Sequence, residues 1–216
     1  MLEFAGIRLP DSPLCLAARE LVARIGPPAL EHHVLRSYLY AEWIGQKRRL
    51  TYDREVLCVA AVLHDLGLTR LAPVRSRFEL EGADLAREFL STRGLDAARS
   101  DLVWEAIALH TTAEIAQRRS VEVGLCQLGV AADVRGLPEV EAEPQLVDQV
   151  LEAYPWLDMD QALLALLVGL YQKNPASSAS HAVADACERF VPGFTRVNLC
   201  DVLLERARRS RTHSRS

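Results

Sequence analysis

Apolar residues recur every three or four positions along most of the chain, which is the spacing of an α-helix that buries one face. Runs of β-branched residues with a period of two are scarce. The pattern therefore predicts an all-α protein without a sheet. The expected helices cover residues 13–25, 30–46, 56–63, 79–91, 96–110, 121–134, 145–153, 160–172, 181–190 and 197–209.

Composition agrees with a single helical domain. The chain has 216 residues, and half of them are hydrophobic, which is enough to form a core without disulfides or structural metals. We expect this domain to span residues 1–205. Residues 206–216 contain five arginines among serines, so we expect them to form a basic, disordered tail.

Charge and cysteine content exclude several classes of protein. The net charge of −4 gives no reason to expect nucleic acid or a membrane as a partner. The residues after Met1 lack the basic region and apolar run of a signal peptide, so we expect none, and the longest apolar stretch is too short to cross a bilayer. The cysteines are widely spaced and form no CxxC pair, which indicates reduced thiols in a cytoplasmic protein. They are Cys15, Cys58, Cys126, Cys187 and Cys200.

The most informative residues are His64 and Asp65, which end a nearly featureless apolar helix. Burying an ionised carboxylate there costs several kcal/mol unless a cation or hydrogen-bond donors compensate. Imidazole and carboxylate are common ligands of divalent metals, so a metal site is one interpretation. The alternative is a capping aspartate beside a histidine that is satisfied within the core.

Two further polar residues lie in similar surroundings. His33 belongs to an amphipathic helix one element earlier, and Asp133 ends another apolar helix. In order, these residues resemble the His…His-Asp…Asp signature of the HD-domain superfamily of metal-dependent phosphohydrolases. The resemblance implies an HD-type helical bundle in which His33, His64, Asp65 and Asp133 bind one divalent metal ion, zinc or alternatively iron or manganese.

Additional motifs resemble the cyanamide-hydratase-like branch of this superfamily. In that branch a histidine precedes an arginine by three residues, as His33 precedes Arg36 here. The resemblance extends from about Pro10 to Phe194. It includes LHDLGLT at 63–69, FELEGA at 78–83, LHTT at 109–112, DVRGL at 133–137 and KNPAS at 173–177.

Departures from other HD proteins favour a mononuclear site. Members with two metals have a histidine where this chain has Phe78, and a later histidine pair is reduced to His110 and Thr111. Leu68 replaces the lysine that often follows the motif in cyclic-dinucleotide phosphodiesterases. Both differences argue against cyclic-dinucleotide phosphodiesterase activity.

The resemblance also suggests catalytic residues. We predict catalytic roles for His110, Asp65 and Glu81, although a histidine satisfied in the core and a glutamate in the first turn of a helix are ordinary structural features. The same ambiguity applies to Glu79. The roles of His32 and Lys173 stay open at this stage.

The leading hypothesis is a cyanamide-hydratase-like enzyme, in which a metal-bound hydroxide hydrates a nitrile such as cyanamide to urea. The alternative is an HD phosphohydrolase acting on a nucleotide or phosphate ester, which would need a cationic clamp near the metal. A metal-stabilised interaction module without activity is a third hypothesis. We expect a small-molecule substrate as the partner, and formation of a homo-oligomer stays open.

Overall fold

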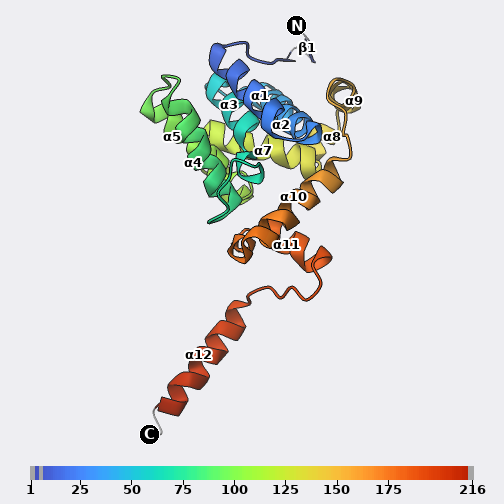
Figure 1. Cartoon of the computed structure of the whole chain (residues 1–216). Helices are drawn as coiled ribbons and strands as arrows, with labels where there is room; N and C mark the ends of the chain where they lie inside the picture. The colour runs from blue at the N-terminus through green and yellow to red at the C-terminus, as the bar shows by residue number, and fades with distance from the viewer. Residues whose placement is uncertain (1–2, 5–6, 214–216) are drawn as a thin grey trace.

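A computed structural model describes residues 3–4 and 7–213, and it confirms the all-α class (Figure 1). The helices are α1 (Pro13–Ile25), α2 (Pro28–Lys47), α3 (Arg54–Leu63), α4 (Phe78–Ser91), α5 (Ala97–Leu109), α6 (Ala113–Ala116), α7 (Val121–Arg135), α8 (Pro138–Glu141), α9 (Pro144–Ala153), α10 (Met159–Lys173), α11 (His181–Phe190) and α12 (Leu199–His213). The 3-10 helix η1 (Leu66–Leu68) lies between α3 and α4, and η2 (Pro175–Ala179) lies between α10 and α11. The short strands β1 (Glu3–Phe4) and β2 (Ile7–Arg8) pair antiparallel. Among the described residues, no helix is long and apolar enough to cross a membrane.

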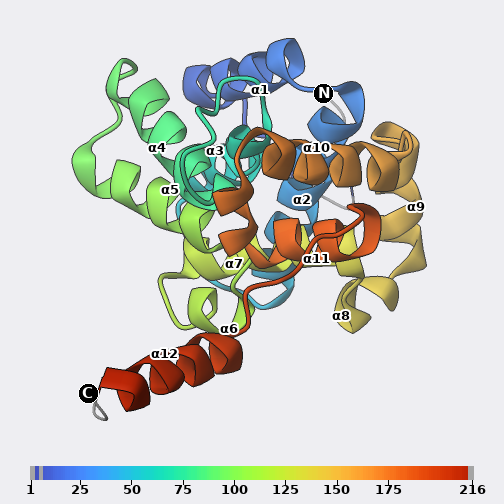
Figure 2. The same cartoon turned by 60° about the horizontal axis from the view of Figure 1, so that its bottom comes forward.

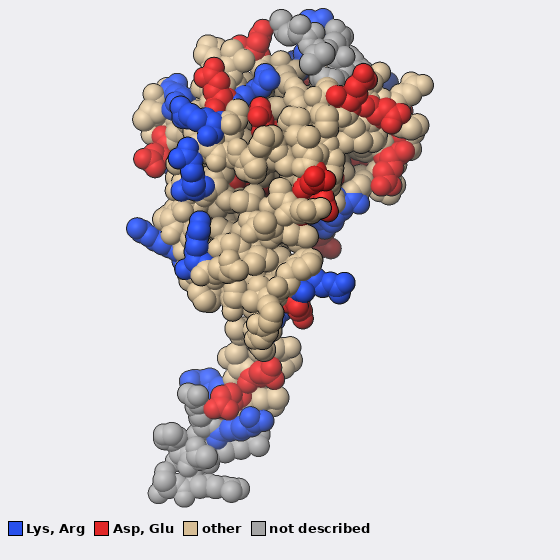
Figure 3. Space-filling view, turned by 45° about the vertical axis from the view of Figure 1, so that its right-hand side comes forward, with Lys and Arg blue, Asp and Glu red and all other residues tan. Residues whose placement is uncertain are grey.

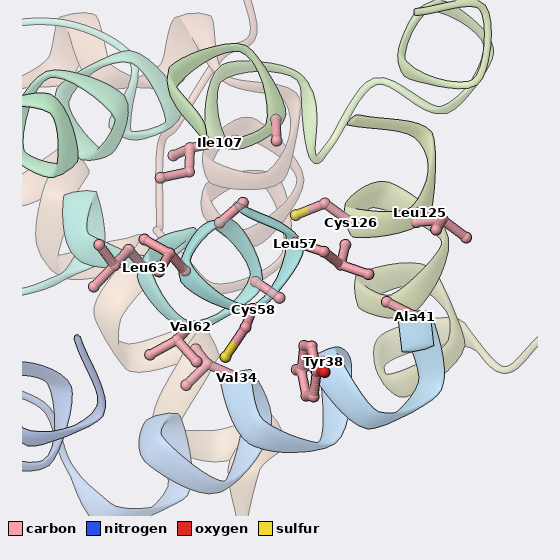
Figure 4. Packing of buried hydrophobic residues seen from close by; sticks show 14 of the residues in the cluster. Val34, Tyr38, Ala41, Leu57, Cys58, Val62, Leu63, Ile107, Leu125 and Cys126 are labelled. Atoms are coloured by element: carbon pink, nitrogen blue, oxygen red, sulfur yellow. The ribbon is translucent and has the colours of Figure 1, made fainter. Parts of the chain in front are cut away.

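Helix α3 lies at the centre of the bundle. Its N-cap is Asp53, whose carboxylate accepts hydrogen bonds from the first turn. All residues from Val56 to Leu63 are buried, as their unbroken apolar pattern predicts. Figure 4 shows the neighbours of α3, which include Tyr38 of α2, Ile107 of α5 and Cys126 of α7.

Helices α2 and α7 pack closely because α7 has a glycine at the contact. A Cβ atom on Gly129 would lie only 2.1 Å from the carbonyl oxygen of Ser37. His33 lies one turn before Ser37 on α2, and Asp133 lies one turn after Gly129 on α7. The close approach of the two backbones therefore brings these two polar side chains together.

A second close contact holds the segment that follows α3. A Cβ atom on Gly67 would lie 1.9 Å from the carbonyl oxygen of Phe78, and one on Gly82 would lie 2.9 Å from the backbone nitrogen of Gly67. The first turns of α4 therefore pack directly on η1, which begins just after His64 and Asp65. This contact fixes the backbone at the end of α3.

Helices α10 and α11 form a smaller layer over the bundle (Figure 2). Leu167 of α10 and Val183 of α11 belong to a hydrophobic cluster that also contains Leu68 and Phe78. This layer therefore packs against the η1–α4 region and covers the ends of the helices that carry the polar residues.

The C-terminal segment differs from the sequence prediction. We expected a disordered tail from residue 206, but α12 continues as a helix to His213, and residues 214–216 lie outside the described part. Arginine and alanine predominate in residues 206–211, and both are good helix formers, so the helix continues through them. Figure 1 shows α12 extending away from the bundle. In Figure 3, acidic and basic side chains are both present on α12 and on the visible face of the bundle.

A glycine substitution tests the α2–α7 contact. We expect Gly129→Ala to lower the free energy of unfolding by about 1–3 kcal/mol, because the added methyl group overlaps the Ser37 carbonyl and forces the helices apart. Urea denaturation followed by circular dichroism measures this change.

Gly169→Ala is the matched control, since a Cβ atom at Gly169 in α10 meets nothing within 4 Å. It should stabilise the protein by about 0.5–1 kcal/mol through helix propensity. Equal effects of the two substitutions would contradict the close packing at Gly129.

Candidate metal site

Three buried side chains converge where α2 meets the end of α3. The Nε2 atoms of His33 and His64 lie 3.1 Å apart. Oδ2 of Asp65 lies 3.5 Å from the Nε2 atom of His33 and 3.3 Å from that of His64. All three residues are almost completely buried, and their potential ligand atoms lie within 4.8 Å of one another.

Backbone contacts determine which imidazole nitrogen carries the proton in His64 and in His110. Nδ1 of His64 lies 2.8 Å from the carbonyl oxygen of Ala61, one turn earlier in α3. A carbonyl oxygen can only accept a hydrogen bond, so Nδ1 is the donor and Nε2 of the neutral ring keeps its lone pair. His110 follows the same rule at the end of α5, where its Nδ1 donates to the Ile107 carbonyl at 2.6 Å.

A carboxylate plays the corresponding role for His33. Its Nδ1 lies 2.6 Å from Oδ2 of Asp133. Asp133 also accepts hydrogen bonds from Arg36, with Nε 2.6 Å from Oδ1 and Nη2 2.8 Å from Oδ2. The ionised carboxylate therefore receives the Nδ1 proton of His33, which leaves the Nε2 lone pair directed at His64.

This donor set fits a divalent metal ion. Two imidazole lone pairs and a carboxylate face one another in a buried space, so a cation there relieves their mutual repulsion and satisfies all three groups. Two nitrogens bound to one tetrahedral zinc ion, each at about 2.0–2.1 Å, are roughly 3.3 Å apart. The 3.1 Å separation of the two Nε2 atoms is close to this value. Zinc, iron and manganese all accept such ligands.

Asp133 meets the other residues in a different way from the one the resemblance implies. Its carboxylate oxygens contact Nδ1 of His33 and the Arg36 guanidinium. A carboxylate in this position orients a ligating histidine and increases its basicity. That Asp133 is itself a fourth ligand stays a prediction.

The ionisable groups influence one another strongly. Burial opposes a charge on both His64 and Asp65, but their mutual attraction and hydrogen bond, together with other neighbouring groups, outweigh it, so the pKa of His64 is raised and that of Asp65 is lowered. Burial, together with the neighbouring His64, lowers the pKa of His110 to about 4. His110 is therefore neutral near pH 7, with an unprotonated Nε2 atom 3.8 Å from Oδ1 of Asp65.

A cavity of about 330 Å³ opens beside these residues. His33, His64, Asp65, His110 and Thr111 contribute to its inner wall. Most of the remaining wall is apolar. It includes Leu68, Phe78, Val130, Ala131, Val134, Leu163, Leu167 and Ala182. The exposed side chains of Arg135, His181 and Asp185 also border the cavity.

The structure places Glu81 away from this cavity wall. Its carboxylate accepts hydrogen bonds from the backbone nitrogens of Val74, at 2.6 Å, and Ser76, at 2.7 Å, and from that of Arg75. Val74 has a positive φ of 54°, which is unfavourable for a β-branched residue. These contacts favour a structural role for Glu81 in the 74–76 loop, and its catalytic role stays a prediction.

Sequence reasoning missed several contacts around the site. Arg36 is fully buried and, besides Asp133, donates to the carbonyl oxygens of Tyr154 and Pro155. His32 lies 2.9 Å from the Pro155 carbonyl through Nδ1. The three-residue spacing of His33 and Arg36 put both on one helix face, but no local pattern identified their distant partners.

Fold and donor set together define an all-helical domain with a candidate metal site. A family model described as HD domain matches residues 30–160, and the chain belongs to the HD-domain family. Members of this family are generally metal-dependent hydrolases. No curated protein matches the chain.

Removal of one imidazole tests the site. We expect wild-type protein reconstituted with zinc to retain about one metal per chain and His64→Ala to lose it, because two donors remain where three converge. Elemental analysis measures the metal. Zinc at about 100 times its dissociation constant should also stabilise the wild type by about 2.7 kcal/mol.

His32→Ala is the control, since His32 neighbours a ligand in sequence but contacts Pro155 outside the cavity. It should keep the metal. Equal metal content in His64→Ala and the wild type would show that the ion binds elsewhere.

Proposed function

We propose that this protein is a metal-dependent HD enzyme that adds water to a small, uncharged nitrogen compound, with a nitrile such as cyanamide as the model substrate. The observation that carries the proposal is the cavity beside His33, His64 and Asp65, whose wall is mainly apolar and has little positive charge. Its volume of about 330 Å³ suits a small molecule.

The positions of the arginines support a neutral substrate over a phosphate ester. A phosphate-binding site needs several cationic groups that converge on the ligand. Of the described residues that line the cavity, Arg135 is the only lysine or arginine, and its side chain is exposed. Arg36 and Arg77 are paired with Asp133 and Glu79, respectively.

The two oxygens of Asp65 face different partners, which suggests two tasks. Oδ2 lies near the Nε2 atoms of both His33 and His64, whereas Oδ1 faces Nε2 of His110. A divalent ion held by the first group would supply Lewis acidity, which lowers the pKa of nearby water. Oδ1 of Asp65 would accept a proton from the reacting water, and neutral His110 would transfer it to the substrate nitrogen.

The proposed overall reaction balances without another reactant. Water and cyanamide combine to form urea. A carbon–oxygen double bond forms, and the carbon–nitrogen triple bond becomes a single bond. The water oxygen becomes the carbonyl oxygen, and both protons of water end on the former nitrile nitrogen. Two proton transfers are needed, and the pair of Asp65 and His110 supplies groups at a suitable position for them.

Turnover by the metal-loaded protein tests the proposal. We expect urea formation from cyanamide, and we expect His110→Asn to lower kcat by about 10²- to 10⁴-fold, because a proton-transfer group is lost. Elemental analysis should show unchanged metal content in this variant. His32→Ala serves as the control and should keep its activity.

The same preparations should be assayed with nucleoside monophosphates and p-nitrophenyl phosphate. Hydrolysis of these esters without turnover of cyanamide or any other small nitrile would contradict the hydratase proposal in favour of a phosphohydrolase. A fully active His110→Asn variant would contradict the role assigned to His110.

A further inference from the structure

Glu79 gathers three hydrogen-bond donors behind the cavity wall. Its side chain is buried, and its Oε1 atom lies 2.9 Å from the Thr111 hydroxyl, 2.9 Å from the Ser180 hydroxyl and 3.0 Å from Nη2 of Arg77. These donors come from the segment before α4, the segment after α5 and the N-terminal end of α11. Glu79 therefore connects three parts of the chain around the cavity.

The direction of these hydrogen bonds is determined by the charge of Glu79. Burial opposes ionisation, but the hydrogen bond from Arg77 and other favourable contacts outweigh it and lower the pKa of Glu79. An ionised carboxylate can only accept hydrogen bonds. The single hydroxyl proton of Thr111 is thus directed at Glu79, and only the lone pairs of its oxygen remain for another partner.

Thr111 lies beside a second group with the same property. Both His110 and Thr111 line the cavity. The proton on Nδ1 of His110 is used by the Ile107 carbonyl, which leaves Nε2 as an acceptor. Oε2 of Glu79, which lies behind this wall, is buried and has no donor among the described residues. Of the cavity-lining groups, the Thr111 hydroxyl oxygen and Nε2 of His110 are therefore both hydrogen-bond acceptors.

We propose that the Glu79–Thr111 pair makes the cavity selective for substrates that present an N–H group to Thr111. The inference rests on the proposed function and narrows its substrate class to small compounds with a free amino or amide nitrogen, such as an amino nitrile or a primary amide. Thr111 is the group that contacts the substrate, and Glu79 is a positioning residue that fixes the direction of its hydroxyl.

This arrangement excludes two kinds of ligand. A compound whose nitrogen is fully alkylated has no proton for Thr111, so it displaces water from this half-buried acceptor and leaves it unsatisfied. Phosphate and carboxylate oxygens carry lone pairs and no proton, so the lone pairs of the Thr111 hydroxyl and of His110 Nε2 repel them. Selectivity for donors is stronger than selectivity for size alone, because a site with a committed polar group penalises a ligand that lacks its partner.

Two hydroxamates test the inference by binding alone. Acetohydroxamate chelates a metal ion and has an N–H group, whereas N-methylacetohydroxamate chelates in the same way and has none. Calorimetry on the zinc-loaded protein gives the dissociation constant of each. We expect the wild type and Thr111→Ser to prefer acetohydroxamate, with a ratio about tenfold higher than in Thr111→Val.

The N-methyl group of the second hydroxamate also adds bulk, which affects binding to every variant alike. Comparing the ratio of dissociation constants between the wild type and a variant therefore removes this size effect. Thr111→Val keeps the shape of the side chain and removes the acceptor. In Glu79→Gln, the new amide can donate to Thr111 and free its proton, so the ratio should fall towards the valine value while the Thr111 side chain is unchanged. Elemental analysis should show equal zinc content in all four proteins.

The outcomes separate this inference from the proposed function. A ratio that is the same in Thr111→Val and the wild type would overturn the inference and leave the metal chemistry intact. Failure of both hydroxamates to bind the zinc-loaded wild type would overturn the proposed metal chemistry and this inference with it. A reduced ratio in both Thr111→Val and Glu79→Gln, with retention in Thr111→Ser, would support it.

Discussion

Three imidazole rings have their Nδ1 protons bound elsewhere, and this constraint determines the chemistry of the site. Backbone carbonyls hold the Nδ1 protons of His64 and His110, and Asp133 holds that of His33. Each Nε2 lone pair is consequently turned towards Asp65, which adds a negative charge. Burial prevents water from screening this arrangement, so a cation is the natural partner of the group.

The backbone contacts that position this group depend on small residues. Gly129 allows α7 to approach α2, and Gly67 allows the turn after α3 to contact α4. Neither contact leaves space for a side chain. The buried ion pair of Arg36 and Asp133 then joins α2 to α7, where removal of either partner would strand a buried charge. The site is therefore part of the packing between helices.

Much of the fold was predictable from the sequence, because local features specify it. The apolar pattern predicted α3, and the predicted ranges of the other long helices are close to the observed ones. The short helices α6 and α8 were missed, since four residues are too few for a periodic pattern. The helical continuation of α12 was missed because arginines among serines are typical of a disordered tail, although arginine and alanine are also good helix formers.

The site was predictable only in part, because its contacts join distant segments. Apolar surroundings drew attention to His64 and Asp65, the resemblance grouped them with His33, and the structure places the three together. The capture of Glu81 by the 74–76 backbone and the hydrogen bond from Thr111 to Glu79 have no local signature. Glu79 and Glu81 are both carboxylates in the first turn of α4 and look alike in sequence. Glu81 nevertheless accepts hydrogen bonds from the 74–76 loop, whereas Glu79 accepts one from Thr111 in the cavity wall.

X-ray absorption spectroscopy of the zinc-loaded protein tests most directly whether His33, His64 and Asp65 bind the metal. We expect a first shell of nitrogen and oxygen at about 2.0–2.2 Å, with outer-shell scattering from two imidazole rings. His64→Ala should abolish this signal, because only two of the three converging donors remain and the metal is lost. Sulfur at about 2.3 Å, or a shell without imidazole, would show that these three residues do not hold the metal.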